Sequence, residues 1–169
     1  MFDPTVFDNL KVVVEGALYD LDLEGSIFIT DRTDEVELAK LSRHYRISFT
    51  TREQYSNEVL AYLDLKMDIA NLSAELQSIP NSKPGCKIEV GFILDIPSID
   101  SCSQYEEVLK EIWGETRLIR QEISFIYNEN KYHNNIKILF NRLMYEDHVD
   151  DLLEMIDYLI HSIQQLNKV

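Results

Sequence analysis

The sequence is poor in the residues that build the common nucleotide and redox sites. Its 169 residues include five glycines and two cysteines. The glycines are scattered, so neither G-x-G-x-x-G nor G-x-x-x-x-G-K, the patterns of a backbone phosphate cradle, occurs. The G-x-S-x-G turn and the C-x-x-C pair are missing as well. These absences argue against a standard nucleotide-binding loop, a serine-hydrolase elbow and a thioredoxin-type centre.

The sequence also has too few cysteines for a disulfide-rich secreted protein and no apolar run long enough for a membrane protein. A strand expected over residues 87–96 would place its two ends about 30 Å apart, and the return from Pro97 to Cys102 spans at most about 20 Å, so Cys102 would not reach Cys86. We therefore predict no disulfide. No apolar run approaches the roughly 20 residues of a membrane helix, and the first ten residues lack the basic and apolar regions of a secretory signal. We expect a cytoplasmic protein that does not bind membranes.

Basic residues are scarce. Sixteen Lys and Arg face thirty acidic residues, so the net charge is −14. The average surface would repel a phosphate backbone, and we expect no nucleic-acid partner. Such a charge favours high solubility and a protein partner with a basic surface. A nucleic-acid mimic that blocks a DNA-binding protein is a third hypothesis, but sequence does not show whether the carboxylates are spaced like phosphates.

What the chain does contain is enough apolar material for a core. Hydrophobic residues make up 45% of the sequence, which is ordinary for a globular domain. We predict a single domain over residues 1–169. The alternative is two halves that meet near residues 80–86, where N-S-K-P-G marks the clearest loop.

Two periodicities predict the elements. Apolar residues at helical spacing predict helices over residues 4–21, 34–44, 51–79, 103–113 and 149–166. Asp3 with Pro4, and Ser103 with Glu106, resemble helix starts. Alternating or β-branched apolar residues predict strands over residues 26–30, 45–50, 88–96, 119–128 and 136–140, the last two as a hairpin.

Two of these elements need separate comment. Residues 34–44 contain good helix formers, and we predict a short helix, with a hairpin strand as the alternative. A T-x-x-Q capping box at residues 51–54 precedes a heptad-like series, made up of Tyr62, Leu65, Ile69, Leu72, Leu76 and Ile79. We predict one long helix here, either in the core or in a homodimer interface.

Several predicted strands have one apolar and one polar face. A parallel sheet covered on both sides would instead show continuous apolar runs. We therefore predict an α+β fold with a mainly antiparallel sheet and amphipathic helices packed on one face.

The stretch Y-E-D-H-V-D-D-L-L-E-M-I-D-Y-L-I-H-S at residues 145–162 is the densest group of ionisable residues. His148 and Asp151 lie one turn apart, as do Asp157 and His161, which would suit a metal. However, H-E-x-x-H is absent, and no second helix offers a matching pair. We predict no metal site and no cofactor. The acids oppose an apolar stripe and should face solvent.

Two other groups are weaker candidates. The most basic local cluster consists of Arg43, His44, Tyr45 and Arg46. It could bind an anion, but we interpret it as a surface turn that balances nearby acids. Neither cysteine has the basic and histidine neighbours of an activated thiolate, so we predict no nucleophilic cysteine.

These observations favour a non-enzymatic acidic interaction module of the adaptor, chaperone-like or inhibitor and immunity type. Its acids would steer a basic protein partner, and the residues that we predict to do so are Asp147, Asp150, Asp151, Glu154 and Asp157. The alternative is a small metal-assisted hydrolase that uses His44, His148 or His161 with acids from other elements.

Overall fold

The strands form one antiparallel sheet. The computed structural model describes residues 5–52 and 59–169. Its six strands pair in the order β1-β2-β3-β4-β6-β5, and every pair is antiparallel. Their bounds are β1 Ile27–Glu37, β2 Ser42–Thr51, β3 Leu60–Met67, β4 Cys86–Ile96, β5 Leu118–Phe125 and β6 Tyr132–Met144. β3 and β4 are neighbours although α2 and the loop at residues 80–85 lie between them in sequence.

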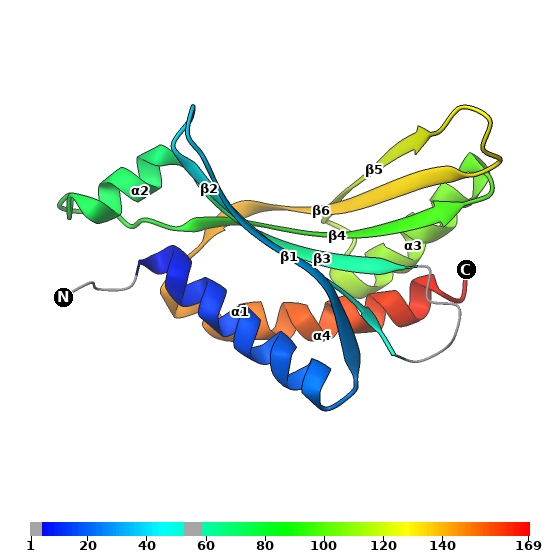
Figure 1. Cartoon of the computed structure of the whole chain (residues 1–169), viewed down its shortest axis with the longest axis horizontal. Helices are drawn as coiled ribbons and strands as arrows, with labels where there is room; N and C mark the ends of the chain where they lie inside the picture. Colours follow the sequence, from blue (N-terminus) through cyan, green and yellow to red (C-terminus); the bar gives the residue numbers. More distant parts are fainter. Residues whose placement is uncertain (1–4, 53–58) are drawn as a thin grey trace.

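Three helices cover one face of this sheet, which confirms the predicted α+β class and layering. The α-helices are α1 Val6–Leu23, α2 Ile69–Leu76, α3 Cys102–Trp113 and α4 Val149–Leu166, with short 3-10 turns before α3 and α4. α1, α3 and α4 lie on the same side, whereas α2 extends beyond one end of the sheet (Figure 1). In the described part of the chain, no helix combines the length and apolarity needed to cross a membrane.

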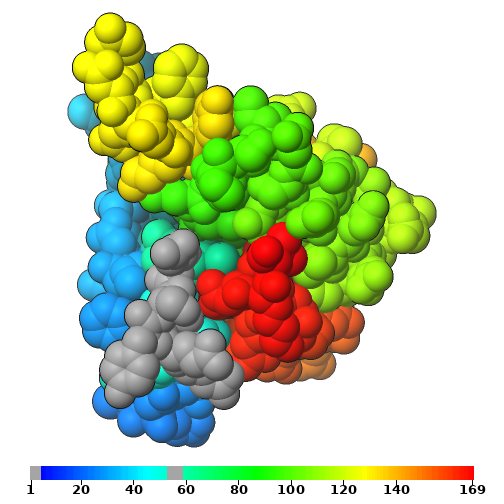
Figure 2. Space-filling model, turned by 90° about the vertical axis from the view of Figure 1, so that its right-hand side faces the viewer, coloured from blue at the N-terminus to red at the C-terminus, as the bar shows by residue number. Residues whose placement is uncertain are grey.

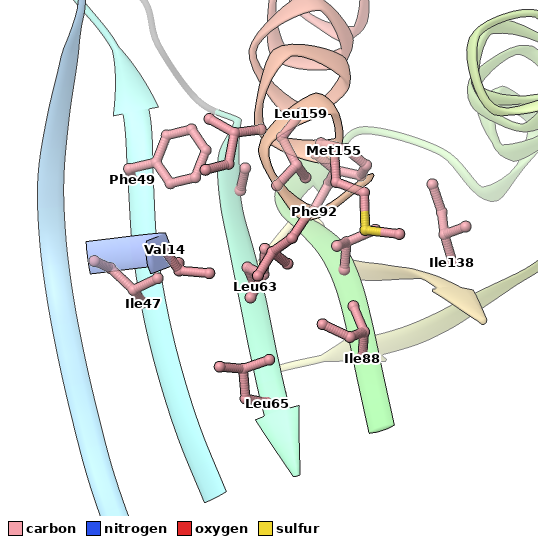
Figure 3. Close-up of a cluster of buried hydrophobic side chains, with 14 of the residues drawn as sticks. Val14, Ile47, Phe49, Leu63, Leu65, Ile88, Phe92, Ile138, Met155 and Leu159 are labelled. Atoms are coloured by element: carbon pink, nitrogen blue, oxygen red, sulfur yellow. The ribbon is translucent and has the colours of Figure 1, made fainter. Parts of the chain in front are cut away.

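Alternation along the central strands explains the core. Ile47, Leu63, Val90 and Ile138 are register partners on four neighbouring strands, and all four are fully buried. Ile47, Leu63 and Ile138 point toward α1 and α4, where Val14, Met155 and Leu159 meet them (Figure 3). Burial of each such side chain stabilises the fold by about 1.5–3 kcal/mol.

The α3 and α4 helices are joined by a buried indole. The Nε1 of Trp113 donates a hydrogen bond to the Oγ of Ser162 at 2.9 Å, and the Trp113 ring packs edge-on against Phe140 and Tyr158. α3 ends at Gly114, whose φ of 104° suits glycine. The predicted end of this helix is therefore confirmed.

The predicted helix over residues 34–44 is wrong, and the hairpin alternative is correct. β1 runs to Glu37, a turn with Leu41 at a φ of 53° follows, and β2 begins at Ser42. Val36 and Leu38 stay 58% and 80% exposed in the hairpin, so apolar burial contributes little to this segment. In the hairpin, a carboxylate oxygen of Asp34 forms an ion pair with the Nη2 of Arg43 at 3.0 Å.

The predicted long helix over residues 51–79 is also wrong. Thr51 ends β2, and its proposed capping partner Gln54 lies outside the described residues. Residues 60–67 form β3, and only Ile69–Leu76 is helical. The strand is buried on both faces. Its apolar residues therefore occupy both odd and even positions, and some of them fall by chance at helical spacing. The homodimer hypothesis based on this helix therefore loses its basis.

The remaining boundaries are close to prediction. The start at Asp3 and Pro4 lies outside the described residues, and Thr5 caps α1 by accepting from the N–H of Asp8 at 3.2 Å. The Ser103 capping box is wrong, because α3 already begins at Cys102. The strand over residues 88–96, the hairpin of β5 with β6 and the C-terminal helix are confirmed.

Candidate functional site

The five predicted partner-binding acids line the outer side of α4 and the turn before it. We call Asp147, Asp150, Asp151, Glu154 and Asp157 the acidic strip. Four of them are exposed, and Asp151 is half-buried. The apolar side of the same helix buries Leu152, Ile156, Leu159 and Ile163. The spacing that fills the core therefore directs the acids to solvent, as the sequence predicts.

Parts of the acidic strip have partners in the same chain. Asp147 lies 3.4 Å from the Nζ of Lys83, and Asp151 lies 3.1 Å from the Nη2 of Arg142. Glu154 accepts a hydrogen bond from the Tyr158 hydroxyl at 2.9 Å. Such exposed ion pairs are weak, so they leave the strip able to exchange these contacts for a partner's cations.

The charge of the molecule is divided unequally between its helices and its strands. In the part of the chain that the structure describes, the four α-helices contain twelve acidic residues and two lysines. The six strands contain eight acidic residues and eight Lys or Arg. The strands are therefore balanced in charge as a set, and the helices carry a large negative excess. α4 itself contains four acids and no Lys or Arg.

The histidines do not converge. His161 is exposed on α4, and the Nδ1 of His148 accepts the backbone N–H of Tyr145 at 3.2 Å. His44 lies in β2. Among residues 5–52 and 59–169, no three or more His, Cys, Asp or Glu side chains gather in a metal-binding arrangement.

The basic cluster of residues 43–46 lies in β2, so its interpretation as a surface turn is wrong. Its two arginines point to opposite faces. Arg43 faces α1, pairs with Asp8 at 2.8 Å and lies over the Phe7 ring. Arg46 faces the other side and meets Asp64. Both arginines therefore pair with acids of the same chain, as the sequence predicts.

The buried carboxylate of Asp64 was missed by sequence reasoning. It lies on the sheet face opposite α1, α3 and α4, and its side chain is fully buried. Arg46 donates two hydrogen bonds to it, both 2.7 Å long. The Nε2 of His44 lies 3.2 Å from the same carboxylate, and the Nζ of Lys66 lies 3.6 Å away and also reaches Glu89.

The protonation of Asp64 follows from these contacts. Burial by itself raises the pKa of this carboxyl, but the hydrogen bonds and charge of Arg46, together with His44, bring it below its usual value. The carboxylate is therefore charged at neutral pH and saturated by cations. Such a group fits a structural role, since its lone pairs are already occupied.

A second buried contact lies beside it. The Tyr62 ring lies across Gly91, and its hydroxyl donates to the Oδ1 of Asn135 at 2.9 Å. The Arg46 guanidinium stacks 3.9 Å above the same ring. We call this group, together with the Asp64 contacts, the polar cluster; its members are His44, Arg46, Tyr62, Asp64, Lys66, Glu89, Gly91 and Asn135.

An open hollow of about 570 Å³ borders the polar cluster at one end of the sheet. Its charged lining consists of Glu35, Glu37, Lys40, Arg43, His44, Lys66, Asp68 and Lys87. Cations and acids are mixed, and Lys40, Arg43 and Lys66 already pair with carboxylates of the chain. The lining of the hollow therefore carries little net charge, whereas the acidic strip is uniformly negative.

The cysteines are not activated. Both are free thiols; Cys86 is buried and Cys102 is half-buried. Burial raises the pKa of the Cys86 thiol to about 12 and raises that of Cys102 as well. Both stay protonated at neutral pH, which opposes a nucleophilic role.

Comparison with protein-family models, with curated proteins and with solved structures finds no match to this chain. The case for its function therefore rests on the geometry and charge described above.

Proposed function

We propose that this protein is a non-enzymatic cytoplasmic interaction module whose acidic strip docks a partner protein with a basic surface. The observation that carries the proposal is the division of charge: the helices hold the negative excess while the strands are balanced as a set. A helix needs only its inner side to pack on a sheet. The outer side of α4 is therefore free to serve recognition.

The expected mechanism is electrostatic steering. Asp150 and Asp157 are exposed two turns apart on α4, and their field adds to that of Asp147, Asp151 and Glu154. A strip of one sign attracts a basic patch over several ångströms and orients it before contact. Its main effect is on the association rate, and ionic strength weakens it.

The test uses charge reversal with a matched control. A tagged protein would capture partners from its native lysate at low salt, and mass spectrometry would identify them. Association of the purified partner would then be timed for wild type, for Asp150→Lys with Asp157→Lys, and for Asp20→Lys with Glu24→Lys. The control pair is exposed at the C-terminal end of α1 and changes the net charge by the same amount.

We expect the α4 pair to slow association about tenfold and to flatten its salt dependence, whereas the α1 pair has a smaller effect. Equal slowing by both pairs would mean that only net charge matters. Unchanged rates in both would refute docking by the acidic strip.

A further inference from the structure

The two edges of the sheet differ in how well they resist pairing with another strand. β1 forms one edge and β5 the other. β1 carries four acids and one arginine, and its pairing with β2 is irregular between Ile29 and Asp31. Charges and bulges of this kind protect an edge strand.

β5 has fewer charges than β1, and its pairing is regular along the whole strand. It has a regular eight-residue register with β6, one arginine and one glutamate. Leu118 and Phe125 at its ends are 54% and 68% exposed. The turn that follows β5, yellow in Figure 2, stands out from the body of the molecule.

The charges of β5 are unevenly matched within one chain. Arg120 lies directly opposite Lys137 of β6, and like charges in that position repel. Lys137 is instead held by Glu122 at 3.0 Å. Within the described ranges, Arg120 has no ion pair, so its guanidinium lacks a carboxylate.

We infer that β5 pairs antiparallel with β5 of a second copy of this chain, with Gln121 on the twofold axis. In this register Arg120 of each copy lies opposite Glu122 of the other, so each interface contains this pair twice. Ile119 lies opposite Ile123, and Leu118 lies opposite Ser124. Side chains opposite each other across antiparallel strands have Cβ atoms about 4.5–5.5 Å apart, close enough for these contacts.

The charges select this register. Opposite residues must share a face of the sheet, so symmetric registers differ by two residues. A shift one way places Arg120 opposite Arg120, and a shift the other way places Glu122 opposite Glu122. Only the register centred on Gln121 joins opposite charges while keeping most of the strand paired.

The pairing would also give hydrogen-bond partners to the backbone N–H and C=O groups along the outer edge of β5. Roughly eight backbone hydrogen bonds would form along a strand of this length, and the two sheets would become one continuous sheet. The acidic strip lies on α4 and takes no part, so this inference is independent of the proposed partner.

The experiment is sedimentation velocity across a concentration series, with circular dichroism to verify folding. We expect wild type to dimerise at about 50 µM, and R120E or E122R to raise the dissociation constant about tenfold or more. R120E places an acid beside Lys137, so the fold should tolerate it. The double variant R120E/E122R restores opposite charges and should restore the dimer.

The control is Glu37→Arg on the β1 edge, which makes the same charge change as E122R at a residue that is also exposed. It should leave the dimer intact. A monomeric wild type at that concentration, a dimer insensitive to R120E, or a folded double variant that stays monomeric would each overturn the inference. Dimers that persist in the α4 charge-reversal variant would separate this result from that of the proposed function.

Discussion

The two faces of the sheet are stabilised by different interactions, although the same strands supply both. On the face toward α1, α3 and α4, Tyr45, Ile47 and Phe49 alternate into an apolar core. On the opposite face of β2 and β3, the half-buried Arg46 forms an ion pair with the buried carboxylate of Asp64. The first face gains stability without directional requirements, whereas the second depends on every hydrogen bond being made. Substitutions should therefore have graded effects on the first and abrupt effects on the second.

The largest effect is expected in the apolar core. Phe92 is fully buried, and Phe92→Ala should lower the free energy of unfolding by about 3–5 kcal/mol because a cavity remains. Urea denaturation measures this loss. Leu23→Ala is the control, since Leu23 is 86% exposed and should change stability by less than about 0.5 kcal/mol. A loss below about 1 kcal/mol at Phe92 would contradict the described core.

The second-largest loss of stability is expected for a substitution in the polar cluster. Asp64→Asn removes the carboxylate that accepts two hydrogen bonds from Arg46, and we expect a loss of about 3 kcal/mol at pH 7. Asp150→Asn, at an exposed acid, should leave the urea midpoint nearly unchanged at the same pH. Equal midpoints for the two variants would mean that Arg46 and Asp64 contribute no net stability.

The pH dependence of that difference follows from the lowered pKa of Asp64. A carboxyl whose pKa is lower in the folded than in the unfolded state stabilises the fold above its unfolded pKa, about 3.9. That contribution disappears as the pH falls through the folded pKa. The gap between wild type and Asp64→Asn should thus be full at pH 7 and shrink below about pH 4. A gap that widened on acidification would reverse this assignment.

A smaller loss of stability is expected where the Tyr62 ring packs on Gly91 of the neighbouring strand. A Cβ at Gly91 would lie 2.6 Å from the carbonyl oxygen of Ile136, and the Tyr62 ring would also clash with it. Gly91→Ala should therefore cost about 2 kcal/mol in thermal or urea unfolding. Gly16→Ala is the matched control: the added methyl in α1 meets nothing within 4 Å, and should stabilise by about 0.5–1 kcal/mol. Stabilisation at both positions would contradict the contact of Tyr62 with Gly91.

The smallest effect concerns the acidic strip. Asp157→Lys replaces a like-charge neighbour of Glu154 on α4 with an attractive one, and should raise stability by about 0.3 kcal/mol at low salt. High salt should remove the gain, which a melting series in sodium chloride would show. A loss above about 1 kcal/mol would assign Asp157 a packing role in place of a recognition role.

Particular elements show how far the sequence could predict this fold. Two elements were predicted correctly because each follows a single periodicity. Apolar residues alternate along Cys86–Ile96, and they form one side of the helix Val149–Leu166. β3 was missed for the opposite reason: as a central strand it is buried on both faces, and its apolar residues follow no single period. The charged hairpin at residues 34–44 was only the alternative to the predicted helix, because local propensity favours a helix there, whereas cross-strand pairing prevailed in the fold.

The candidate site divides in the same way. The outward direction of the acidic strip follows from local spacing on one helix, so the sequence alone was sufficient. The polar cluster joins residues from β2, β3, β4 and β6. No local pattern marks a carboxylate that meets an arginine eighteen positions away, as Asp64 meets Arg46.

By itself, the sequence determined the class of the fold, the apolar sides of its helices and the acidic character of its surface, because periodicity and composition act locally. Only the tertiary structure decided the order of the strands, the burial of Asp64 and which strands form the edges of the sheet, because these depend on contacts between residues far apart in the chain. Charge shows the distinction most directly: composition fixes its total, and folding assigns the negative excess to the helices and a balanced set of charges to the strands.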